Sequence, residues 1–166
     1  ASKIVMKGIA RRGATGADFA GDDAGDAGFL VMMNEIIQDR PDVHRGWLEA
    51  ELDAQIFLSD TKNANAVAKM ADDQTEGMDR KILWASLYQD EKGTNKLTLD
   101  FIFTDKVRNM LNASTAFLAG KKKFGKRTTL RPQSVYDEVA RQVLEDRGLK
   151  SPLGKIDGVP MSQYKP

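Results

Sequence analysis

The stretch DRPDVHRGWLEAELDAQIFL, residues 39–58, combines a helix-opening proline with a long apolar face. Pro41 suits the first turn of a helix, and Asp42 places a negative charge at the positive end of the helix dipole. The apolar residues that follow lie on one face over about 100° wide: Val43, Trp47, Ala50, Ala54 and Phe57, with Leu48, Leu52 and Ile56 beside them. The pattern predicts a helix from about Pro41 to Leu58 that packs on the core.

Later segments show further helix signals. Asn63 or Asn65 can cap a second helix, and a third follows the Gly77–Asp79 punctuation. Thr104 caps the clearest amphipathic helix of the chain, which ends at Gly120. A last helix is expected from a cap near Ser134 to a stop at Gly148, and the alternating apolar residues of 97–103 indicate a strand or an extended connection.

Upstream of the first predicted helix the chain is rich in glycine and aspartate. The repeat DAGDAG at residues 23–28 lacks the spaced ligands and closing glutamate of a calcium loop, so we interpret it as a solvated turn and assign no metal. The apolar run Phe29–Met33 that follows fits a buried strand and also the start of a helix.

Composition excludes several classes of protein. In 166 residues, 41% are hydrophobic and 30% charged, which is typical of a folded domain and not of a disordered or membrane-embedded chain. Cysteine is absent, so a disulfide framework, a thiolate zinc site and a cysteine nucleophile are excluded. We find no nucleophile beside a base, and we interpret His44, the only histidine, as a surface residue. No catalytic residue and no cofactor is expected.

The run Lys121–Arg127 is the one strongly basic feature. Its cations and Phe124 are compatible with a nucleic-acid-binding module, in which cations neutralise phosphates and an aromatic ring stacks on a base. The run also follows a predicted helix C-terminus, where cations complement the dipole, and the formal net charge of the chain is only +1. We therefore favour a solvated face and expect no nucleic-acid partner.

The order of several segments is more specific than any one of them. These segments are Gly16–Phe19, Ala27–Val31, Asp39–Val43, Trp47–Gln55, Asn63–Val67, Gln74–Gly77, Leu83–Tyr88, Phe103–Arg108, Thr115–Leu118, Leu130–Pro132 and Val143–Lys150. Across residues 8–164 the chain resembles the periplasmic solute-binding proteins of ABC importers for nitrate, sulfonates and taurine. That group shares its fold with pyrimidine-synthase-like proteins of thiamine biosynthesis.

The resemblance implies an α/β, periplasmic-binding-protein-like fold of two lobes, of which this chain is the helix-rich C-terminal portion. Residues 1–30 would be the end of the second lobe and the crossing segment, and residues 31–166 the helical return into the first lobe and the C-terminal tail. The N-terminal half of the protein would then be missing from this chain.

The function that the resemblance implies is capture of a small, anionic, nitrate- or sulfonate-like solute in an inter-lobe cleft in the periplasm, for delivery to a membrane permease. Asp26, Gly28 and Phe29, at the lobe crossing, are the predicted ligand-binding residues. The chain is not expected to be an enzyme. The alternative is a thiamine-pyrimidine-synthase-like enzyme of the same fold, which would need a histidine-bearing active site.

Overall fold

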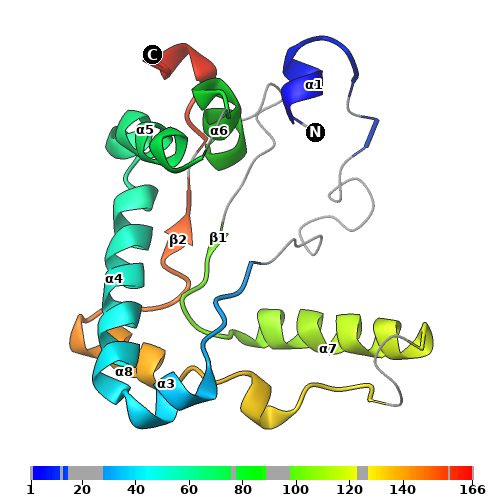
Figure 1. The fold of residues 1–166 in the computed structure, drawn as a ribbon, viewed down its shortest axis with the longest axis vertical. Coiled ribbons are helices and arrows are strands. Elements are labelled where there is room, and N and C mark those ends of the chain that lie inside the picture. The colour runs from blue at the N-terminus through cyan, green and yellow to red at the C-terminus, as the bar shows by residue number, and fades with distance from the viewer. Residues whose placement is uncertain are drawn as a thin grey trace. The chain divides into compact units, whose positions relative to one another are not determined.

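A computed structural model of the chain describes residues 2–11, 13–14, 28–75, 78–88, 98–122, 127–156 and 158–165. Helices dominate these residues (Figure 1). The elements are α1 Ser2–Met6, α3 Asn34–Asp39, α4 Pro41–Ser59, η2 Thr61–Asn63, α5 Ala64–Gln74, α6 Arg80–Leu87, β1 Thr98–Leu99, α7 Asp105–Gly120, η3 Pro132–Ser134, α8 Glu138–Asp146, β2 Gly154–Lys155 and η4 Met161–Gln163.

The predicted α/β two-lobe fold is wrong. Within the described ranges the only strands are β1 and β2, which form a two-residue antiparallel ladder with Thr98 opposite Lys155 and Leu99 opposite Gly154. A two-lobe α/β fold needs sheets whose strands are covered by helices, and a single short ladder cannot build one. The apolar residues 29–33 form neither a helix nor a strand, because an apolar run makes a strand only where another strand supplies its hydrogen bonds.

The chain divides into two compact units, each built from separate parts of the sequence. Unit 1 contains residues 1–26, 51–99 and 154–166, and unit 2 contains residues 27–50 and 100–153. Helix α4 begins in unit 2 and ends in unit 1. The predicted lobe assignment of residues 1–30 and 31–166 stays a prediction.

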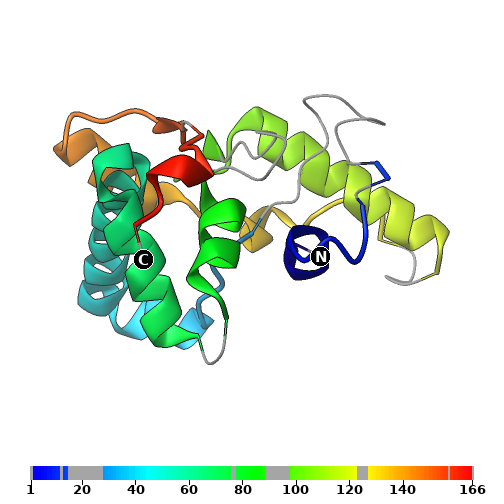
Figure 2. The same ribbon diagram turned by 90° about the horizontal axis from the view of Figure 1, so that it is seen from above.

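The core of unit 1 forms where α5 and α6 pack on each other and the C-terminal segment covers them (Figure 2). Its buried residues are Ala64, Ala68, Trp84, Tyr88, Ile156 and Val159. The indole Nε1 of Trp84 donates a buried hydrogen bond of 2.9 Å to the carbonyl oxygen of Val159. The ring of Tyr164 meets Trp84 edge-on, with centroids 5.8 Å apart. The C-terminal segment is therefore part of this core.

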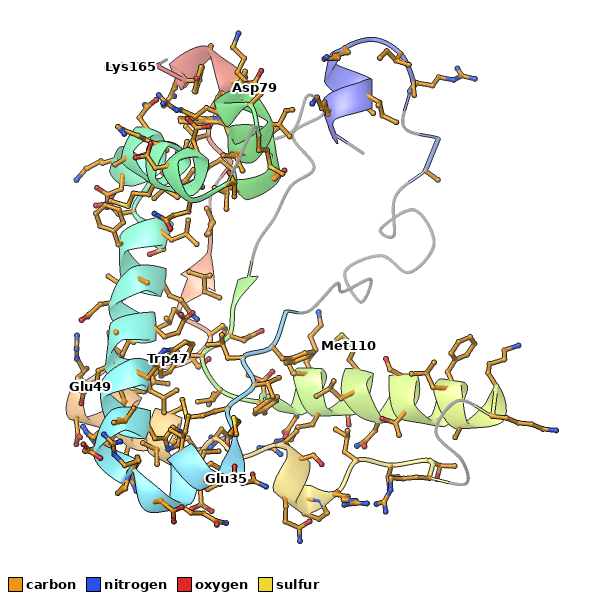
Figure 3. All side chains as sticks on the ribbon, in the orientation of Figure 1. Glu35, Trp47, Glu49, Asp79, Met110 and Lys165 are labelled. Atoms are coloured by element: carbon orange, nitrogen blue, oxygen red, sulfur yellow. The ribbon has the colours of Figure 1, made fainter. Side chains whose placement is uncertain are left out.

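Asn65 on α5 fixes the end of the chain. Its side-chain amide donates to the carbonyl oxygen of Gln163 at 3.2 Å, and its side-chain oxygen accepts from the backbone nitrogen of Lys165 at 2.7 Å. Asn63 occupies the N-cap position of α5, but its amide bonds to the carbonyl oxygen of Phe57 instead of capping the helix. Neither asparagine caps α5 as predicted, since each side chain satisfies backbone groups elsewhere. Asp79, the N-cap residue of α6, and Lys165 lie at the same end of this unit (Figure 3).

The core of unit 2 includes one face of α8, where Ala140, Val143 and Leu144 are buried. Helix α8 begins at Glu138, later than predicted, because Ser134 belongs to the short helix η3. It ends at Asp146, with Gly148 at a φ of +64°. The nitrogen of Gly148 donates to the carbonyl of Glu145, and that of Leu149 to the carbonyl of Leu144, which is the Schellman arrangement that favours glycine at this position.

The predictions for α4 and α7 hold at their boundaries. Helix α4 starts at Pro41 and runs one residue beyond the predicted end at Leu58. The Thr104 hydroxyl caps α7 by accepting from the nitrogen of Val107 at 3.4 Å, and the helix ends at Gly120. No helix among the described residues has both the length and the apolar composition needed to cross a membrane.

The predicted burial of α4 is only partly correct. Leu52 is fully buried, as expected of a residue on a core-facing helix. The stripe that contains Val43, Trp47 and Phe57, which we expected to pack on the core, is exposed instead. The buried face of the helix includes Leu52 and His44, so its inward direction is rotated away from the most aromatic stripe. Periodicity identified the helix but not its inward direction.

Candidate anion-binding site

The structure places the three predicted ligand-binding residues in different surroundings, or outside the described residues. Asp26 lies outside the described residues. Gly28 is exposed, and a Cβ atom added to it would meet no atom within 4 Å. It therefore does not line a packed binding site. Phe29 is 42% exposed, and its ring stacks nearly parallel on the ring of Phe103, with centroids 5.9 Å apart and an interplanar angle of 12°. Of the three, Phe29 alone is described in contact with a cluster of side chains in unit 2.

Phe103 connects Phe29 to a guanidinium group. The Cζ atom of Arg108 lies 5.7 Å from the centroid of the Phe103 ring, within the range of a cation–π interaction. The Nε of Arg108 also donates to the carbonyl oxygen of Phe103 at 3.0 Å. Both residues are positioned by the start of α7, since Phe103 precedes the Thr104 cap and Arg108 lies in the first turn of the helix. Figure 3 draws the side chains around this end of α7.

A buried carboxylate, Asp137, organises the charged part of the cluster. Its side chain is 8% exposed. It accepts a hydrogen bond of 2.9 Å from the backbone nitrogen of Phe103. The Nη2 of Arg108 lies 3.3 and 3.2 Å from its two oxygens, and Arg141 binds it in a fork through Nε at 3.2 Å and Nη2 at 2.9 Å. Such charge-assisted contacts hold both guanidinium groups in a fixed geometry.

The cluster carries more positive than negative charge. Within the described part of the chain, Asp137 is the only carboxylate that forms an ion pair with Arg108 or Arg141, so two guanidinium groups share one carboxylate. The two arginine side chains are 33% and 50% exposed. Their Nη1 groups donate to no acceptor among the described residues, because the hydrogen bonds above use only Nε and Nη2. The cluster therefore presents donors and one uncompensated positive charge.

A second arginine network in unit 2 has the opposite stoichiometry. Arg45 on α4 donates to Glu49 at 2.8 Å and to Asp146 at 2.6 Å, so one guanidinium is shared by two carboxylates. The hydrogen bond to Asp146 is the main cause that raises the pKa of Arg45. This network carries a net negative charge, and it serves as a natural reference for the Asp137 cluster.

The chemistry that the Asp137 cluster supports is binding of an anion. Guanidinium groups are planar, permanently charged donors that match pairs of oxygens on a carboxylate, sulfonate or nitrate. The single carboxylate takes part in five donor contacts, so both of its oxygens are engaged by Phe103, Arg108 and Arg141. No group of His, Asp and Glu side chains suited to a metal ion occurs in the described residues.

The remaining sequence-based candidates do not join this cluster. His44 is buried, contrary to the prediction of a surface residue, and its ring packs 5.9 Å from the ring of Tyr136. It is buried because α4 turns this face of its first turns inward. Of the basic run, Lys121 and Lys122 are exposed, while residues 123–126 lie outside the described residues.

Sequence reasoning missed four members of the cluster: Phe103, Arg108, Asp137 and Arg141. The spacing of Asp137 and Arg141 at i and i+4 was visible and is typical of a helical ion pair. The pairing of Arg108 with Asp137 joins positions 29 apart, which no local pattern can indicate.

Comparison of the chain with family models, with curated proteins and with solved structures finds no match. The resemblance to solute-binding proteins of ABC importers therefore stays a prediction.

Proposed function

We propose that the chain binds a small anionic solute without converting it, as the periplasmic solute-binding component of an ABC importer that delivers the solute to a membrane permease. The observation that supports the solute class is the surplus positive charge of the Arg108–Asp137–Arg141 cluster. The importer role rests on the resemblance of the sequence. The anion site lies within unit 2 and requires no cleft between α/β lobes.

The cluster suits a weakly hydrated anion such as a sulfonate or nitrate. These anions only accept hydrogen bonds, and the free Nη1 groups of Arg108 and Arg141 only donate them. Because Asp137 already holds both side chains, binding orders few additional rotamers, and this lowers the entropic cost of association. Partial exposure of both guanidinium groups leaves them accessible to a solute from water.

The experiment is isothermal titration calorimetry at low ionic strength with nitrate, methanesulfonate and taurine. The informative variant is Arg141→Gln, because Asp137 keeps its contacts with Arg108 and the cluster becomes neutral. We expect the variant to bind the preferred anion at least about 10-fold more weakly, as a charged hydrogen bond contributes roughly 1.5–3 kcal/mol.

The matched control is Arg45→Gln, which removes a guanidinium of the same unit from a network that already has excess negative charge. Affinity should stay at the wild-type level in this control. Equal losses in Arg45→Gln and Arg141→Gln, or no binding of any of the three anions, would refute the site. Mass spectrometry of the recovered solute tests the absence of conversion, and uptake of labelled solute by cells carrying wild type or Arg141→Gln tests the importer role.

A further inference from the structure

We infer that the solute carries a planar apolar group beside its anionic group, and that Phe29 selects it. This inference rests on the proposed anion site and concerns the other part of the solute. It makes Phe29 a specificity-determining residue and names aryl sulfonates and related aromatic anions as the ligand class.

Phe29 combines a fixed ring orientation with partial exposure. Its ring lies nearly parallel to the ring of Phe103, with centroids 5.9 Å apart. The residue remains 42% exposed, so Phe29 is accessible to a ligand. An aromatic ring in a fixed orientation is a platform for a second planar ring, since stacked rings attract each other beyond the burial of apolar area. The pair with Phe103 supplies that fixed orientation.

Phe103 contacts both Phe29 and Arg108. Its ring contacts Phe29 and lies 5.7 Å from the guanidinium carbon of Arg108. The platform and the positive charge are therefore one aromatic ring apart. A ligand that contacts both features needs an anionic group joined to an aromatic ring by a linker that spans the ring of Phe103. Nitrate and methanesulfonate can use only the charge.

The residues that follow Phe29 are apolar. Leu30 and Val31 follow Phe29 directly, and both are exposed. No charged side chain occurs from Phe29 to Met33. The surface beside the ring is thus apolar, and contact with an aryl group removes apolar area from water on both partners.

Unit 2 offers a matched control pair. Phe117 on α7 is 64% exposed, and the Nζ of Lys121 lies 5.6 Å from its ring centroid. This pair also combines an exposed aromatic ring with a cation. It has no second ring stacked on Phe117 among the described residues and no buried carboxylate that fixes the cation, so it should not select aryl anions.

The test is calorimetric titration of the whole chain with methanesulfonate, cyclohexanesulfonate, benzenesulfonate and 3-phenylpropanesulfonate. Cyclohexanesulfonate matches benzenesulfonate in charge and approximate size but lacks a planar ring. We expect the better of the two aryl sulfonates to bind about 2- to 10-fold more tightly than cyclohexanesulfonate. Phe29→Leu should abolish this preference without weakening methanesulfonate, and Phe29→Tyr and Phe117→Leu should retain it.

The outcomes separate this inference from the proposed function. If methanesulfonate binds and wild type shows no preference for aryl over cyclohexyl, the inference fails and the anion site stands. A preference that persists in Phe29→Leu, or that disappears equally in Phe117→Leu, also overturns it. If no sulfonate binds, the anion site itself fails. The wild-type comparison needs no variant, so a misfolded Phe29→Leu would not leave the inference undecided.

Discussion

Replacement of Tyr88 by phenylalanine tests the core of unit 1. Tyr88 is 1% exposed, and its ring lies 5.3 Å from that of Trp84. Its hydroxyl oxygen is buried and has no hydrogen-bond partner in the described part of the chain. A buried polar group without a partner costs roughly 1–3 kcal/mol, whereas phenylalanine fills the same space without a hydroxyl. We therefore expect Tyr88→Phe to be more stable at pH 7, by about 1 kcal/mol.

The same burial makes stability depend on alkaline pH. Burial raises the pKa of Tyr88 from 10.0 to about 12. The unfolded chain therefore loses this proton at lower pH than the folded chain. Below pH 10 both states keep the proton and Tyr88 has no effect on the pH dependence. Above pH 10 unfolding releases the proton, so the free energy of unfolding falls as pH rises. The loss attributable to Tyr88 is about 1.4 kcal/mol at pH 11.

The assay is urea denaturation followed by circular dichroism from pH 7 to pH 11. Lysines also titrate in this range, so the informative quantity is the difference in free energy of unfolding between wild type and Tyr88→Phe. We expect this difference to grow by about 1.4 kcal/mol between pH 9 and pH 11. The control is Tyr136→Phe, which removes the hydroxyl of an exposed tyrosine and must keep the alkaline loss caused by Tyr88. A difference that is constant with pH, or a Tyr88→Phe protein clearly less stable at pH 7, would refute the reasoning.

Three further substitutions test other contacts. Asp137→Asn should lower the free energy of unfolding by roughly 2–3 kcal/mol in urea titrations, because two half-exposed guanidinium groups lose their shared carboxylate; an unchanged stability would show that the cluster is not formed. Val159→Ala should cost about 1–3 kcal/mol, since this buried side chain joins the C-terminal segment to the core of unit 1, and wild-type stability would argue that the segment does not dock. Gly148→Ala should lower the free energy of unfolding by about 1–2 kcal/mol because φ is +64° there, and Gly148→Asn should lower it less. Thermal denaturation of both variants measures the difference, and equal losses would contradict the role of the positive φ.

Helix boundaries were the part of the fold that the sequence predicted well. The residues that set these boundaries act on the backbone of their own helix turn: Pro41, Thr104 and Gly148. Because the effect is local, the sequence alone is enough to predict it. The cap near Ser134 and the caps of α5 were predicted incorrectly, since the polar side chains concerned bond elsewhere or lie in another element. Capping by asparagine and serine competes with distant backbone groups, and a local pattern cannot show which partner wins.

The fold class and the burial of α4 could not be predicted, for a related reason. An apolar run such as 29–33 becomes a strand only if a partner strand is available, and the partner is a property of the whole chain. Periodicity gave α4 two adjacent apolar stripes and could not show that Leu52 is buried while Trp47 is exposed. Phe29 was identified as a candidate, but its neighbour Phe103 is more than 70 positions away.

The role of Asp137 argues that the arginine cluster serves binding in addition to stability. Asp137 occupies the N-cap position of α8, yet its carboxylate makes no cap bond with that helix. A lost cap costs about 1 kcal/mol, and the charge-assisted bonds to Phe103, Arg108 and Arg141 offset it. One arginine would suffice to neutralise the carboxylate. The second arginine adds a positive charge that stability does not require. In the same unit, by contrast, Arg45 pairs with two carboxylates. Asp137 thus gives up a helix cap and instead holds a surplus positive charge at an accessible surface. Such a departure from the locally favoured arrangement is expected of a binding site.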